Sequence, residues 1–125
     1  MQDKYTPGPW EAMGTLVRSP MHQPDGLPRG VQIAECRDGY FLPHTPEAKA
    51  NARLIAAAPE LLEAMKKRVK NAEERAFEDW LARERPSGDV ESVQRQWEES
   101  SDLADMHAEW SSEIALIAKA TGSAL

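Results

Sequence analysis

The sequence of 125 residues predicts an α+β protein. A short N-terminal β-hairpin or three-stranded sheet is covered by an alanine-rich helix and is followed by a long antiparallel helical hairpin. Six of the nine prolines lie between Pro7 and Pro43, and they separate two segments typical of short strands. An alanine-rich stretch with helix-start residues comes next. The second half of the chain then carries apolar residues at intervals of three and four, which indicates helices.

Length and composition limit the class of protein. A chain of this length forms one domain, and its hydrophobic content of 41% can build a core without a disulfide or a metal. Cys36 is the single cysteine, and we expect it to pack as a small apolar residue on a strand. No apolar run approaches the roughly 20 residues that span a bilayer, and the first residues do not form a signal peptide. We therefore expect a cytoplasmic protein.

The N-terminal third predicts two strands, at residues 10–17 and 31–36. Residues 19–30 hold three prolines and two glycines, which predicts a long loop between the strands. A third short strand is expected around residues 40–42. So few strands are not stable by themselves, and they need a helix across one face.

That helix is predicted over residues 47–58. Thr45 is a good N-cap, Pro46 suits the first helical position, and Glu47 places a carboxylate in the first turn. Helical spacing puts Asn51 on one face with four apolar residues, namely Ala48, Ala52, Ile55 and Ala58. We therefore expect Asn51 to face inward. Pro59 then begins a second helix.

Residues 60–121 predict two long helices of about 27 and 33 residues, joined by a turn at residues 86–88. Ser87 or Asp89 can cap the second helix, and Ser100 and Ser101 weaken its middle. A hairpin of this length cannot bury its own apolar seam on all sides, so a homodimer is expected, with Trp97 and Trp110 contributing to assembly. The predicted organisation is a β-plus-helix module at residues 1–62 and a helical hairpin extension at residues 63–125, within one continuous folded unit.

The net charge of −6 is unevenly distributed. Residues 1–45 carry four basic and five acidic side chains, and residues 46–70 carry six basic and three acidic ones. Residues 71–125 carry five basic and thirteen acidic side chains. This layout argues against direct nucleic-acid binding. It suits a polar protein-binding face, or self-association of oppositely charged patches.

Two segments of the chain have distinctive sequences: residues 6–10 read T-P-G-P-W, and residues 50–62 read A-N-A-R-L-I-A-A-A-P-E-L-L. Both resemble segments of a family of small phage and prophage proteins. The likeness covers about the first half of the chain, and residues 66–125 look like a member-specific extension. The resemblance implies an accessory gene product of a bacterial virus that acts in the host cytoplasm, in host takeover or in countering antiviral defence. It carries no enzymatic activity over to this chain.

Five residues are candidates for binding a partner: Trp10, Asn51, Arg53, Trp97 and Trp110. A structural role is favoured for the first two, since large aromatic side chains dominate small cores and a buried amide usually bonds to the backbone. Arg53 lies on another helix face, where it is solvated or paired with a carboxylate. We predict no catalytic residue, no metal site and no cofactor. A host protein is the expected partner besides a second copy of the chain.

Two alternatives remain open. Glu73, Glu74 and Glu78, followed by Glu99 and Asp102, resemble the carboxylates that bind Mg²⁺ in all-α nucleotide pyrophosphohydrolases of the MazG kind. The first motif is displaced by one residue, and one helical step turns a ligand by about 100°. The second alternative is an acidic mimic of DNA that uses the thirteen carboxylates after residue 70. Its field is diluted by interleaved arginines, namely Arg75, Arg83, Arg85 and Arg95.

Overall fold

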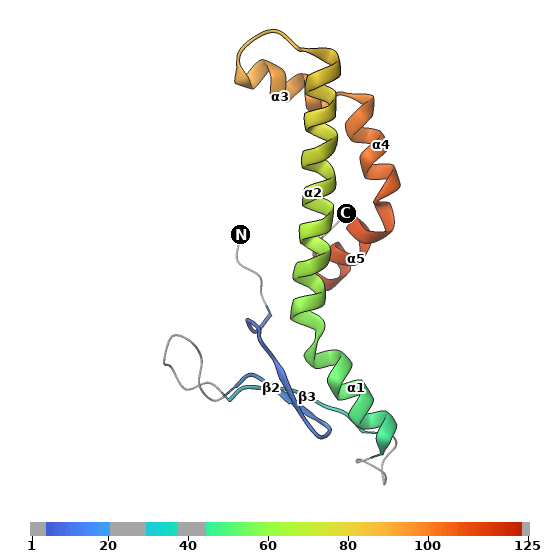
Figure 1. Ribbon diagram of the computed structural model, residues 1–125. Coiled ribbons are helices and arrows are strands. Elements are labelled where there is room, and N and C mark those ends of the chain that lie inside the picture. Colours follow the sequence, from blue (N-terminus) through green and yellow to red (C-terminus); the bar gives the residue numbers. More distant parts are fainter. Residues whose placement is uncertain (1–4, 21–29, 38–44, 124–125) are drawn as a thin grey trace. The chain divides into compact units, whose positions relative to one another are not determined.

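The computed structural model of the protein describes residues 5–20, 30–37 and 45–123 (Figure 1). Its elements are, in chain order, β1 (Glu11–Met13), β2 (Leu16–Arg18), β3 (Gln32–Glu35), α1 (Pro46–Ala56), α2 (Ala58–Glu84), α3 (Val90–Glu98), α4 (Ser101–Glu109) and α5 (Ser111–Thr121). The chain forms two compact units, Met1–Glu63 and Ala64–Leu125. The α+β class is therefore confirmed, with a three-stranded antiparallel sheet in the order β1-β2-β3.

The single strand predicted over residues 10–17 is wrong, because this segment is a hairpin. Met13 pairs with Leu16, which leaves Gly14 and Thr15 as a two-residue loop. Gly14 has a φ of 63°, a conformation that glycine adopts without steric cost and that tight hairpin turns require. Glu11 and Arg18 pair across the two strands, and their side chains form an ion pair of 3.0 Å.

The third strand of the sheet is β3, which pairs with β2. The backbone N–H of Ser19 donates to the carbonyl of Val31 at 2.9 Å, and the Val31 N–H donates to Ser19 Oγ at 3.0 Å. These bonds extend the pairing beyond β2. The strand predicted around residues 40–42 lies outside the described residues.

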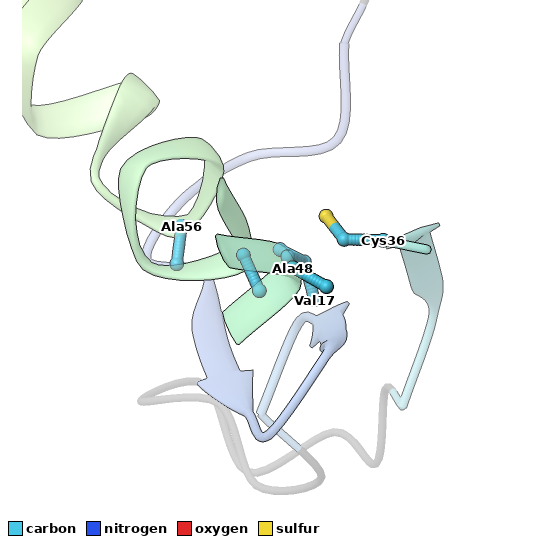
Figure 2. Close-up of a cluster of buried hydrophobic side chains, with 5 residues drawn as sticks. Val17, Cys36, Ala48 and Ala56 are labelled. Atoms are coloured by element: carbon cyan, nitrogen blue, oxygen red, sulfur yellow. The ribbon is translucent and has the colours of Figure 1, made fainter. Parts of the chain in front are cut away.

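The core of the first unit is small and lined by alanines. Val17 of β2 is fully buried against three alanines of α1 and against Cys36, and Figure 2 shows Val17 and Ala48 meeting between the helix and the strands. The alanines are Ala48, Ala52 and Ala56. Their short side chains allow α1 to pack closely on β1 and β2. The expected burial of Cys36 as a small apolar residue is confirmed, but Cys36 lies just after β3 and not on a strand.

Helix α1 begins as predicted, but it faces the sheet with a different stripe. Thr45 Oγ1 accepts a hydrogen bond of 3.2 Å from the Ala48 N–H, and Pro46 is the first helical residue. Asn51 is exposed, so the expectation that it faces inward is wrong. The buried positions recur at every fourth residue, and Asn51 lies about 100° around the axis from its neighbour Ala52.

The first predicted long helix is confirmed, since α2 has 27 residues. Arg85, with a φ of 46°, follows its end, and Asp89 caps α3 by accepting a hydrogen bond of 2.8 Å from the Ser92 N–H. Within the described part of the chain, none of the helices has the length and apolar character that crossing a membrane requires.

The second predicted long helix is wrong, because three shorter helices take its place. Ser100 Oγ accepts a hydrogen bond from the Leu103 N–H at 3.2 Å and donates one to the Trp97 carbonyl at 2.6 Å. The side chain thus caps α4 and ends α3 at the same point. A second break follows at Trp110, between α4 and α5. Helix α4 runs back alongside α2 (Figure 1).

Three aromatic rings hold α3 on α2. The ring centroids of Phe77 and Trp97 are 5.2 Å apart, those of Trp80 and Trp97 are 5.4 Å apart, and Phe77 meets Trp80 edge-on at 5.9 Å. Trp97 is only 3% exposed. Trp97 therefore belongs to the core of the second unit, Ala64–Leu125, which we call the helical unit. Its loss destabilises this unit first and affects assembly only second.

We predict that Ala52→Leu lowers the free energy of unfolding by about 1–3 kcal/mol, because the larger side chain overpacks the contact between α1 and the sheet. The matched control is Ala50→Leu, an exposed position on the same helix, with an expected change within about 0.5 kcal/mol. Urea unfolding followed by circular dichroism measures both. Equal effects of the two variants would contradict the packing of α1 described above.

We predict that Trp97→Ala lowers the free energy of unfolding of the helical unit by about 3–5 kcal/mol, because it removes a buried ring that packs against two others. Trp110→Ala should cost less, since Trp110 is only half-buried. Chemical denaturation and the near-ultraviolet circular dichroism of the tryptophans report both effects. A Trp97→Ala variant as stable as the wild type would show that the aromatic cluster does not hold α3.

Candidate functional site

An open groove lies between α2 and α3, and we call it the acidic groove. It encloses about 540 Å³. Its lining residues are Lys70, Glu73, Glu74, Phe77, Glu78, Leu81, Gln94 and Trp97. The six residues from α2 recur at intervals of three and four, so they form one continuous face of that helix.

The floor of the acidic groove is apolar. Phe77 is half-buried and Leu81 is 36% exposed, while Trp97 lies beneath them in the aromatic cluster. Leu81 is a large apolar side chain that water still reaches, and covering it is favourable by the hydrophobic effect. The floor can therefore receive an apolar side chain of a partner.

The rim of the acidic groove is charged. Glu74 and Glu78 are exposed and Glu73 is half-buried, with Lys70 at one end. Over the parts of the chain that the structure describes, none of these four side chains has an ion-pair partner. Three carboxylates against one ammonium leave a local excess of negative charge, which attracts cationic groups.

A second groove, between α2 and α4, has a mixed-charge lining. Arg83 Nη2 donates a hydrogen bond of 2.7 Å to Asp102 Oδ1, and Arg83 Nε donates one of 3.0 Å to Glu84. Asp102 first and Glu84 second raise the pKa of the Arg83 guanidinium above its ordinary value. The groove also contains Arg75, beside Asp79 and other acidic residues. Its charges are therefore partly compensated within the unit.

The carboxylates of the hydrolase-like motifs do not line one common groove, and Glu99 lines neither of the two. Glu73, Glu74 and Glu78 line the acidic groove, whereas Asp102 lines the second groove and pairs with Arg83. Among the described residues, no group of three or more His, Cys, Asp or Glu side chains is arranged to hold a metal ion. The carboxylates of the hydrolase-like motifs therefore do not surround one metal position.

In the first unit, the two sequence motifs come together. The indole N–H of Trp10 donates a hydrogen bond of 3.0 Å to the Thr6 carbonyl, and the ring packs against the core. A Cβ added to Gly8 would lie 2.8 Å from the Pro59 Cβ, so only glycine fits at this contact. Trp10 therefore packs against the core that α1 and the sheet form. An open cleft of about 450 Å³ lies at this junction, lined by both motifs.

The five predicted candidates are not brought to one site. Trp97 lies under the acidic groove, Trp110 lines the second groove, and Trp10 belongs to the motif junction. Asn51 and Arg53 are exposed on α1. The prediction missed the acidic groove itself. Its signal was the face of α2 that combines three glutamates with Phe77 and Leu81.

The comparisons with known proteins agree with the resemblance to small phage proteins. A family model described as Salmonella phage P22 protein Y8K6 matches residues 1–124. No curated protein and no solved structure matches the chain significantly. Because the match includes the helical unit, the expectation that residues 66–125 are a member-specific extension is wrong. The chain belongs to the phage protein family of Salmonella phage P22 protein Y8K6.

Proposed function

We propose that this protein is a phage accessory protein that acts without catalysis, by binding a protein of the bacterial host through the acidic groove. The observation that carries the proposal is the combination of a water-accessible apolar floor with an acidic rim that forms no ion pair with any described residue. The place of action is the host cytoplasm. Sequestering a host protein would serve host takeover or counter-defence equally well.

The composition of the acidic groove suits protein recognition. Binding energy at protein interfaces concentrates in a few well-packed anchors, and charged rims mainly govern partner choice and association rate. Phe77 and Leu81 offer the surface for such an anchor. Glu74 and Glu78 would select a partner segment that carries lysine or arginine beside the anchor.

The same charges support recognition more than catalysis. Metal-dependent pyrophosphate cleavage needs several carboxylates around one ion in near-octahedral geometry. Here Asp102 is engaged with Arg83 in the other groove. A DNA mimic needs an extended negative field, and Arg75 and Arg83 interrupt that field along the second groove.

We predict that Glu74→Lys/Glu78→Lys abolishes capture of the host partner from lysate, because the reversed charges repel the cationic segment of that partner. The partner is identified by mass spectrometry as the protein that wild type retains. The matched control is Asp105→Lys/Glu109→Lys, which makes the same change of charge in the second groove and should retain the partner. Equal retention by both double variants would place host binding elsewhere on the molecule.

We predict that the protein releases no pyrophosphate from nucleoside triphosphates in the presence of Mg²⁺, above the level of a Glu74→Ala/Glu99→Ala variant. We expect this result because the candidate carboxylates do not line one common groove. A coupled pyrophosphate assay over the four common ribonucleotides and deoxyribonucleotides makes the measurement. Turnover that depends on these glutamates would refute the non-catalytic proposal.

A further inference from the structure

We infer that, in the free protein, the acidic groove is occupied by a second copy of the chain. In this homodimer the two α2 helices pair antiparallel about a two-fold axis at the level of Ala72. Lys67 and Lys70 of each copy lie over the acidic rim of the other. The inference uses the groove of the proposed function, but it does not require a host partner.

The first argument is the order of charges along one face of α2. Lys67 and Lys70 lie on the same helical face as Glu74 and Glu78, because their spacings are close to multiples of 3.6 residues. All four side chains are exposed. Throughout the described residues, none of them is engaged in an ion pair. The face is therefore basic before Asn71 and acidic after Ala72.

The second argument is symmetry. A two-fold axis across the helix reverses the direction of the second copy, so its basic half meets the acidic half of the first. Lys70 then faces Glu74 of the second copy, and both such contacts form at once. A parallel pairing would place lysine beside lysine and glutamate beside glutamate, which is unfavourable. The charge order thus selects the antiparallel arrangement.

The third argument is the apolar floor. The groove opens at Lys70 and continues over Phe77 to Leu81, and its volume is about 540 Å³. In the antiparallel register, Lys67 of the second copy lies at the level of Phe77. The methylene chain of a lysine can cover an aromatic ring while its ammonium reaches a carboxylate at the rim. One lysine side chain thus contacts both the apolar floor and the acidic rim of the groove.

A second copy is the favoured occupant because the chain itself contains the complementary segment. Residues 46–70 hold six basic and three acidic side chains, and residues 71–125 hold five basic and thirteen acidic ones. The two opposite surfaces share one helix, which fixes the distance between them. A host segment that uses the same groove would have to displace the second copy.

Complementary charge reversal tests the dimer. Wild type should have about twice the chain mass of 13.9 kDa by light scattering and sedimentation. Lys67→Glu/Lys70→Glu and Glu74→Lys/Glu78→Lys should each be monomeric, with the helical circular dichroism of wild type. An equimolar mixture of the two variants should again give the dimer mass, because the reversed charges match across the axis.

A cysteine one residue from the level of the two-fold axis tests the register. Asn71→Cys should form a disulfide-linked dimer in a glutathione buffer much faster than Ser112→Cys, an exposed position on α5. Wild type is the blank, since its Cys36 is buried.

Three results would overturn the inference. They are a monomeric wild type at micromolar concentrations, dimers that persist in both charge variants, and equal cross-linking at positions 71 and 112. A monomeric wild type that still captures a host protein through Glu74 and Glu78 would remove the dimer and leave the proposed function standing. If the dimer meets all of these tests and no host protein is captured, the dimer stands and the proposed function is contradicted.

Discussion

The helical unit depends on the packing of Trp97 against Phe77 and Trp80. Helix α3 has nine residues, fewer than an isolated helix needs to be stable in water, so tertiary contacts must hold it. Packed aromatic rings bury much apolar area and add a geometric preference of about 0.5–1.5 kcal/mol per pair. Because this cluster attaches α3 to α2, it creates both the second wall and the floor of the acidic groove. Phe77 and Trp97 therefore contribute both to the candidate binding site and to the stability of the unit.

The sequence predicted the features of the fold that local chemistry determines. Thr45, Pro46 and Asp89 mark helix starts because a side-chain acceptor or a fixed φ acts within one turn. The break at Ser100 could not be decided locally, since serine is tolerated inside helices as well as at caps. The helix breaks at Ser100 because the chain returns along α2, and this packing depends on the whole unit. The turn at Gly14 was missed because the apolar residues on both sides fit one strand equally well.

The candidate site was less predictable than the fold. The prediction that Asn51 faces inward depends on the spacing of Ala48 and Ile55. A helical face that contains these two residues can extend toward Asn51 on one side or toward the buried alanines on the other. In the structure, the stripe with the smallest side chains packs on the sheet, and the Asn51 side chain is exposed. For the acidic groove, the sequence contains a glutamate-rich stretch and a nearby Phe77. It does not reveal which of these residues pack beside Trp97. That juxtaposition joins residues about twenty positions apart through tertiary packing, and no periodicity within one helix encodes it.

The glutamates of the acidic groove cost the isolated unit some stability, and this cost argues for their role. Glu74 and Glu78 stand four residues apart on one face of α2, where like charges are unfavourable by about 0.2–0.5 kcal/mol. Elsewhere in the unit, by contrast, Arg83 compensates Asp102 directly. Departures from the local rules of helix design are expected at functional or strained sites. A cationic segment lying over the rim relieves the repulsion and covers Leu81 at the same time, so the groove becomes more stable only when it is occupied.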